Sequence, residues 1–100
     1  MKYRLTELAK LDISEITRHI RYQQQSPQNA RLVAIRLQSL FERLTQNPNL
    51  GHRRVELSDE NARVIFVTGL LVIYDPFLKP LTILRVIHSS RDLHRIMPRD

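Results

Sequence analysis

Five cationic or imidazole side chains stand close together near the carboxyl end of the chain. They are Arg85, His88, Arg91, His94 and Arg95. An arginine guanidinium is a planar donor that matches a pair of phosphate oxygens, and a histidine exchanges a proton near neutral pH. These residue types could bind a phosphate or assist the cleavage of RNA.

Acid and base catalysis on RNA also requires a proton acceptor at the attacking 2′-hydroxyl and a proton donor at the leaving oxygen. Here only the cations are abundant. If the chain is a nuclease, we expect its catalytic residues to be His88, Arg91, His94 and Arg95. No other part of the chain offers a comparable set.

Several other kinds of site are excluded by what the sequence lacks. The four histidines are scattered, and no cysteine or carboxylate set completes a metal site. Gly51 and Gly69 are the only glycines, so neither a glycine-rich phosphate loop nor a dinucleotide fingerprint is present. We expect neither a metal nor a cofactor.

Arg85 is unusual because it lies in a strongly apolar segment, between Ile83 and Ile87. A charged group in such a place needs a partner or an open cleft. The alternative is an edge-strand arginine whose guanidinium reaches out to water. Arg53 and Arg54 are adjacent cations on an expected loop, where they either touch an acidic partner or nucleic acid, or are simply solvated.

The composition predicts one globular domain over residues 1–100, with 42% hydrophobic and 26% charged residues. The first residues are too polar for a signal peptide, and no segment approaches the roughly 18 apolar residues of a membrane span. With no cysteine to form a disulfide, a soluble cytoplasmic protein is expected. A net charge of +6 favours a nucleic acid or an acidic protein as partner, although dispersed charges also suit a solvated surface.

The elements that must position these residues begin with a short strand at residues 3–5 and two amphipathic helices. Thr6 is the expected cap of the first helix, and Ser26 with Pro27 starts the second. Because the link between them is short, the helices should form an antiparallel hairpin. The inward stripes are Ala9, Ile13, Ile16 and Ile20 in the first helix, and Ala30, Val33, Ala34, Leu37, Leu40, Phe41 and Leu44 in the second.

The second half of the chain is predicted to be sheet. Residues 62–67 and 70–74 flank Thr68-Gly69, a two-residue hairpin signal, and residues 81–88 form a third strand. A short C-terminal helix carrying Leu93, Ile96 and Met97 follows. The fold class is therefore α+β, with the helical hairpin packed on a largely antiparallel sheet.

A few apolar side chains lie off the inward stripes of both helices. Such residues form a surface for a partner helix or strand, or are the scattered apolar residues that any protein surface carries. They are Leu8, Leu11, Tyr22, Leu32 and Ile35.

Taken in order, these residues resemble the RelE/ParE toxin superfamily over nearly the whole chain. The resemblance is carried by Ala9, Asp12, Ile13, Ile16 and Ile20, by Asn47-Pro48 and Gly51, by Arg63, by Gly69 with Val72-Ile73-Tyr74, and by residues 83–88 with Arg91-Asp92. It implies a toxin of a type II toxin-antitoxin module, which a cognate antitoxin neutralises. Such modules serve in plasmid stabilisation.

The resemblance leaves two activities, inhibition of DNA gyrase as in ParE-like toxins and ribosome-dependent cleavage of mRNA as in RelE-like ones. RelE-like nucleases carry an arginine shortly before the tyrosine of the central strand, where this chain has Leu71-Val72-Ile73 before Tyr74. Met97 stands where such enzymes have a terminal tyrosine, and the chain has only three lysines. A ParE-like gyrase inhibitor that is not an enzyme is therefore favoured.

The resemblance gives the site residues their expected roles. For the target, we expect contacts from Arg53, Arg54, Arg63, Arg85, Arg91 and Arg95. For the antitoxin, we expect contacts from Leu8, Leu11, Tyr22, Leu32 and Ile35.

Overall fold

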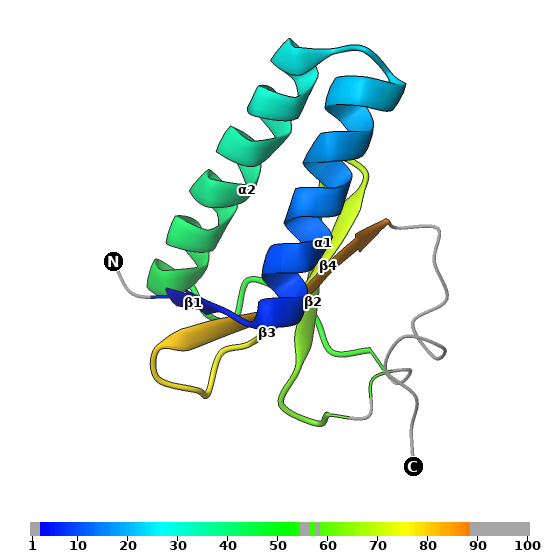
Figure 1. The fold of residues 1–100 in the computed structure, drawn as a ribbon. Coiled ribbons are helices and arrows are strands. Elements are labelled where there is room, and N and C mark those ends of the chain that lie inside the picture. Colours follow the sequence, from blue (N-terminus) through cyan, green and yellow to red (C-terminus); the bar gives the residue numbers. More distant parts are fainter. Residues whose placement is uncertain (1–2, 55–56, 58, 89–100) are drawn as a thin grey trace.

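A computed structural model describes residues 3–54, 57 and 59–88 of the chain. Two helices stand as a hairpin over one face of a four-stranded sheet (Figure 1). The elements are β1 (Tyr3–Leu5), α1 (Glu7–Arg18), a π-helical turn η1 (His19–Gln23), α2 (Pro27–Gln46), β2 (Arg63–Val67), β3 (Leu70–Asp75) and β4 (Leu81–His88). The predicted α+β fold is confirmed, while the expected C-terminal helix lies outside the described residues.

Both helices begin at the predicted caps. The Thr6 hydroxyl accepts a hydrogen bond from the backbone N–H of Ala9 at 3.0 Å. Ser26 does the same for Asn29 at 3.3 Å, and Pro27 occupies the first turn, where a missing N–H leaves no bond unmade. These caps satisfy N–H groups that have no partner inside the helix, so they fix where each helix starts.

The sheet has the strand order β1-β4-β3-β2. β2, β3 and β4 pair antiparallel as predicted, whereas β1 pairs parallel with β4 through Tyr3–Leu81 to Leu5–Ile83. Thr68 and Gly69 turn the chain between β2 and β3 with φ angles of 45° and 82°, the positive values that a tight hairpin turn requires.

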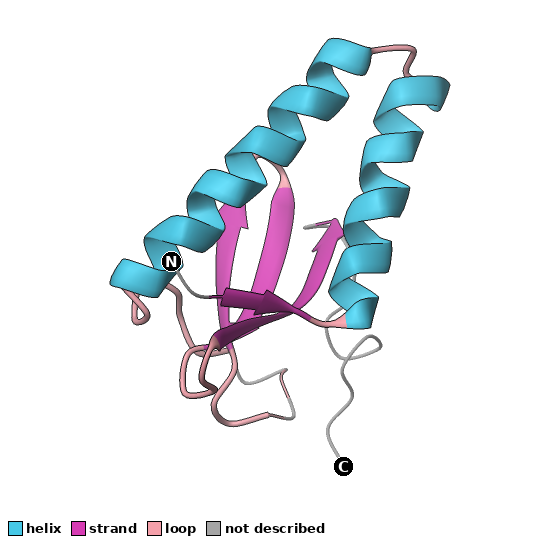
Figure 2. Cartoon of the chain, turned by 60° about the vertical axis from the view of Figure 1, so that its left-hand side comes forward, coloured by secondary structure: helices cyan, strands magenta, loops and turns pink. Residues whose placement is uncertain are grey.

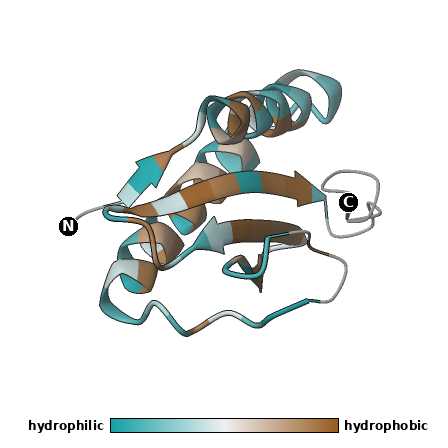
Figure 3. Cartoon of the chain, turned by 90° about the horizontal axis from the view of Figure 1, so that it is seen from below, coloured by the Kyte–Doolittle hydropathy of each residue, from teal (hydrophilic) through white to brown (hydrophobic). Residues whose placement is uncertain are grey.

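The sheet carries apolar side chains on both faces, and the helices cover one of them (Figure 2). Leu70, Val72 and Tyr74 of β3 pack against α1 and α2, while Leu71 and Ile73 face the other way, toward Leu57. Figure 3 shows hydrophobic residues concentrated along the strands. β3 is therefore buried along its whole length.

The predicted inward stripe of α2 is largely confirmed. Leu37, Leu40, Phe41 and Leu44 are buried in the core. Ala34 is the correction, because it is exposed. Ala30 is buried although it lies one turn nearer the hairpin tip, so the exposure of Ala34 reflects its place at the margin of the apolar stripe.

Among the described residues, neither helix combines the length and the apolar character that a membrane crossing requires.

Candidate functional site

The charged residue in the apolar strand has a partner, which is Asp12 of α1. Arg85 Nε donates to Asp12 Oδ2 at 2.7 Å, and Arg85 Nη2 donates to Oδ1 at 2.9 Å. The backbone N–H of Val86 also donates to Oδ2, at 3.0 Å. One carboxylate thus receives three hydrogen bonds from β4 and ties it to α1.

This ion pair is largely withdrawn from water. Asp12 is 9% exposed, and the Arg85 side chain is 19% exposed. The hydrogen bond to Asp12 raises the pKa of Arg85 above its ordinary value, so the guanidinium stays charged. Arg85 therefore does not reach out to water, and the need for a partner that its apolar surroundings predicted is confirmed.

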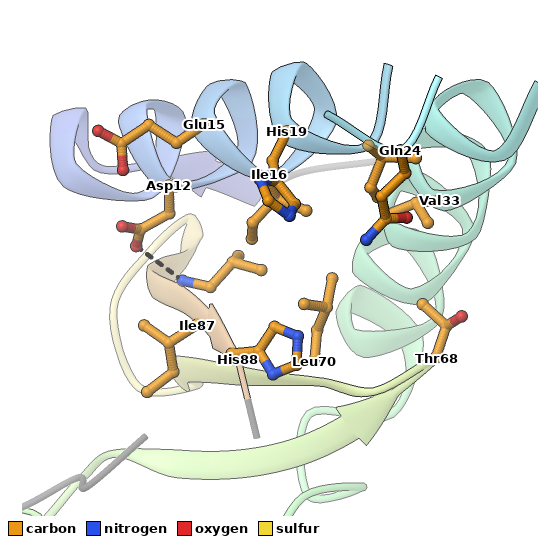
Figure 4. Close-up of a pocket in the computed structure, with 12 residues that line it drawn as sticks. Asp12, Glu15, Ile16, His19, Gln24, Val33, Thr68, Leu70, Ile87 and His88 are labelled. Carbon is orange, nitrogen blue, oxygen red and sulfur yellow. Dashed lines mark hydrogen bonds between the residues drawn. The ribbon is translucent and has the colours of Figure 1, made fainter. Parts of the chain in front are cut away.

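Beside this pair, a cleft of about 360 Å³ lies between the helical hairpin and the ends of β3 and β4 (Figure 4). Ile16, Val33, Leu70 and Ile87 give it apolar walls. The polar side chains that line it are Asp12, Glu15, His19, Gln24, Thr68 and His88. The cleft thus combines an apolar interior with a polar rim, as sites for side chains of a partner commonly do.

The charge of this cleft bears on the chemistry that it can perform. Among the described residues that line it there is no lysine or arginine, whereas Asp12 and Glu15 both carry carboxylates. Asp12 is already paired with Arg85, so Glu15 is the carboxylate that a group held in this described part of the cleft would meet. The described lining therefore offers an apolar surface with the exposed carboxylate of Glu15 beside it.

His88 is the only residue of the expected nuclease set within the described chain, and it lies at the end of β4 on the rim of the cleft. Arg91, His94 and Arg95 lie outside the described residues. His19 and His88 line the same cleft as the two carboxylates (Figure 4). Even so, no three histidine or acidic side chains of the described part are arranged to hold a metal ion.

Three of the expected target contacts surround the loop before β2. Arg53 Nη1 donates to the backbone oxygens of Asp59 and Ala62, both at 2.9 Å. Arg63 Nη1 donates weakly to the Asn61 oxygen at 3.3 Å, and its guanidinium lies 5.7 Å from the centre of the Phe77 ring. Arg54 follows Arg53 in the sequence and is half-buried. β3 separates β2, which carries Arg63, from β4, which carries Arg85.

Tyr74 fixes the chain where it leaves α2. Its hydroxyl accepts from the backbone N–H of Gly51 at 2.7 Å and donates to the Pro48 oxygen at 2.8 Å. Burial raises the pKa of Tyr74 above its ordinary value of 10.0, so the phenol remains protonated and able to donate. Asn47-Pro48 and Gly51 are thus positioned by the central strand.

The five residues expected to meet the antitoxin are all exposed, by 42% to 66%. Leu8, Leu11 and Tyr22 follow each other at helical spacing on α1 and η1, and Tyr22 lines a small hollow with Glu15. Leu32 lies one turn from Ile35 on α2, and Ile35 lines a different groove, along β2. α1 lies against β4, whereas Ile35 of α2 lines the groove beside β2, so the five residues form two patches on opposite flanks of the hairpin.

Sequence reasoning did not identify Asp12 and Glu15 as site residues. The signal for Asp12 was present, because this acid falls between Ala9 and Ile16 on the inward face of an amphipathic helix. Such a residue needs a buried cation or backbone donors. For Glu15 there was no such signal, since it lies on the exposed side of α1.

The fold has a counterpart among solved structures. The structure of the chromosomal ParDE TA system from P. aeruginosa matches with a TM-score of 0.73 over 90% of this chain and 97% of that chain, at 20% sequence identity. At this identity the match shows a shared fold. A search of curated proteins found no match.

The sequence matches the model of a family described as the ParE toxin of the type II toxin-antitoxin system parDE, over residues 3–93. This range takes in both helices, all four strands and the Asp12–Arg85 pair. The chain belongs to the ParE family of type II toxins.

Proposed function

We propose that this protein arrests growth by inhibiting DNA gyrase, and that a cognate antitoxin holds it inactive in the cytoplasm. The match to the ParE toxin family over residues 3–93 carries the proposal. Leu71-Val72-Ile73 stands before Tyr74, where RelE-like nucleases carry an arginine, and this favours a binding protein over a nuclease. The net charge of +6 suits a target that works on DNA, and an acidic antitoxin.

For the contacts with the target we propose Arg53, Arg54, Arg63 and Arg85, together with Arg91 and Arg95. Arg85 uses Nε and Nη2 for Asp12, so its Nη1 group is the part proposed for a contact. Arg53 and Arg63 also hold the loop before β2. Substitutions there therefore need a check of folding.

Purified protein is expected to block the supercoiling of relaxed plasmid by gyrase, or to make cleaved plasmid accumulate, while ribosome-bound mRNA stays intact. A triple variant with glutamine at Arg53, Arg54 and Arg63 should need about tenfold more protein for half inhibition, because these charges guide and hold the target. Circular dichroism checks that the variant folds.

The matched control carries glutamine at Arg18, Arg21 and Arg31, which are exposed and belong to the helical hairpin. This control loses the same number of positive charges. If both variants lost inhibition equally, the loss would come from net charge alone. Unaffected gyrase would contradict the proposal. Cuts in ribosome-bound mRNA that disappear in His88→Ala would replace it with the nuclease activity.

We propose that the antitoxin covers both exposed apolar patches of the hairpin. One is Leu8, Leu11 and Tyr22, and the other is Leu32 and Ile35. Since they lie on opposite flanks, one antitoxin chain would have to cross the hairpin to contact both.

The antitoxin, taken as the acidic protein encoded beside this chain, is expected to bind more weakly when either patch is changed to alanine. A loss on the order of 30-fold for each patch corresponds to removing a central apolar anchor. Isothermal titration measures it. Phe77→Ala with Leu78→Ala removes exposed apolar area elsewhere and should leave the affinity unchanged. Unchanged binding by both patch variants would place the antitoxin on another surface.

A further inference from the structure

The two sides of the sheet differ in how their outer backbone groups are satisfied. On the β4 side, beyond the end of β1, the Thr6 hydroxyl donates to the Leu84 oxygen at 2.8 Å. Two residues further on, Asp12 accepts from the Val86 N–H. Side chains therefore occupy backbone groups that another strand would otherwise use.

The β2 side is closed at Val64 and open at Phe66. Val64 exchanges two hydrogen bonds of 2.8 Å with His52, which shows that its backbone groups point outward from the sheet. Outward groups alternate along a strand, so Phe66 presents the next N–H and C=O on this edge. Within the described part of the chain, no hydrogen bond reaches either group of Phe66.

A groove of about 480 Å³ runs beside this edge, between β2 and α2. Ile35 lines the groove and is 50% exposed, and Phe66, which is 58% exposed, borders it from the edge of the sheet. Arg36 and Arg43 line the same groove, and no carboxylate does among the described residues. Arg36 Nη1 donates to the Thr68 hydroxyl at 3.2 Å, so this guanidinium is held at the edge.

We propose that this edge binds an extended, acidic segment of a partner protein, which pairs with the backbone of Phe66 as an additional strand. Main-chain pairing gives such a segment its alignment, and alternate side chains give it specificity. The positive charge of Arg36 and Arg43, which no described lining residue neutralises with a carboxylate, favours carboxylates on the partner.

The alternation of side chains defines the segment further. Ile65 and Val67 face the helices, while Phe66 lies on the opposite face, with Val64. An added strand therefore presents every second side chain toward Arg36 and Arg43, and the side chains between them toward Phe66. Carboxylates alternating with apolar residues match this arrangement.

A second copy of this chain fits the edge poorly. Two β2 edges paired around Phe66 would bring Arg36 and Arg43 of each copy close to those of the other, in a protein whose net charge is already +6. Like charges placed together weaken association. A different protein with acidic side chains is therefore the favoured occupant of this edge.

The inference does not depend on gyrase being the target. If the antitoxin supplies the acidic segment, binding at this edge is part of the proposed neutralisation. The test below uses neither gyrase nor the antitoxin. A failure of the gyrase assay and a failure at this edge are therefore distinguishable.

The probe is a capped hexapeptide in which glutamate and valine alternate, added to the isotope-labelled full chain and followed by NMR. Saturable shifts centred on Phe66, with slower exchange of its amide proton, are expected. The same peptide with lysine in place of glutamate should not bind. Reversing both groove charges, with Arg36→Glu and Arg43→Glu, should weaken the acidic peptide about tenfold.

Two variants sharpen this test. Arg21→Glu with Arg31→Glu changes the charge equally, outside the groove, and should retain binding. Phe66→Pro removes the outward N–H without removing a bond to β3, and the acidic peptide should then bind more weakly, as measured by the shifts of the neighbouring amides. Equal binding of the lysine peptide, shifts centred elsewhere, equal loss in the control variant, self-association through the edge, or binding of a single-stranded oligonucleotide there would each overturn the proposal.

Discussion

Asp12→Ala is expected to lower the free energy of unfolding by about 3–5 kcal/mol, a large part of the roughly 5–15 kcal/mol of an ordinary domain. The change leaves the Arg85 guanidinium without its counter-charge and the Val86 N–H without an acceptor, both largely shielded from water. Urea unfolding followed by circular dichroism measures the loss.

A double variant separates two causes of the stability loss in Asp12→Ala, the unpaired charge of Arg85 and the lost packing. With Arg85→Met added to Asp12→Ala, most of the stability should return, because a buried ion pair replaced by apolar side chains is often close to neutral. Glu15→Ala removes an exposed carboxylate from the same helix and should change stability little. If Asp12→Ala were as mild as Glu15→Ala, the pair would not be what joins α1 to β4.

Gly51→Ala is the second substitution with a large expected effect, about 3 kcal/mol. A Cβ atom at this position would lie 2.6 Å from the Val64 oxygen and 2.7 Å from the Tyr74 hydroxyl. Both atoms belong to the sheet, and Tyr74 is fully buried, so neither can move away easily. The hydrogen bond from the Gly51 N–H to Tyr74 would be disturbed as well.

Gly69→Ala is the matched control, because an added Cβ there meets no atom within 4 Å. Its φ of 82° still strains an alanine, by about 1–2 kcal/mol. Thermal and urea unfolding should therefore rank Gly51→Ala as clearly the more damaging. Tyr74→Phe in the Gly51→Ala background should cost less than in the wild type, since the clash with the hydroxyl is then gone. Additive losses would contradict a direct contact between these residues.

Several features were predictable from short stretches of sequence. The starts of the helices were predicted from Thr6, Ser26 and Pro27, and the β-hairpin from Thr68-Gly69. Caps and turns depend on a few neighbouring residues. The apolar stripes identified most of the core. Arg85 stood out as a charged residue in an apolar strand.

The sequence by itself therefore determined the elements and their order, and it left Arg85 with a partner, an open cleft or an exposed edge. Only the tertiary structure decided that Asp12 is the partner, that β1 pairs parallel with β4, and that the exposed apolar residues divide between two flanks. It also decided that Asp12 and Glu15 line the cleft, and that side chains close β4 whereas the β2 edge stays open at Phe66. These features join residues far apart in the chain, so they depend on how whole layers pack, whereas a local pattern reports only on its neighbours.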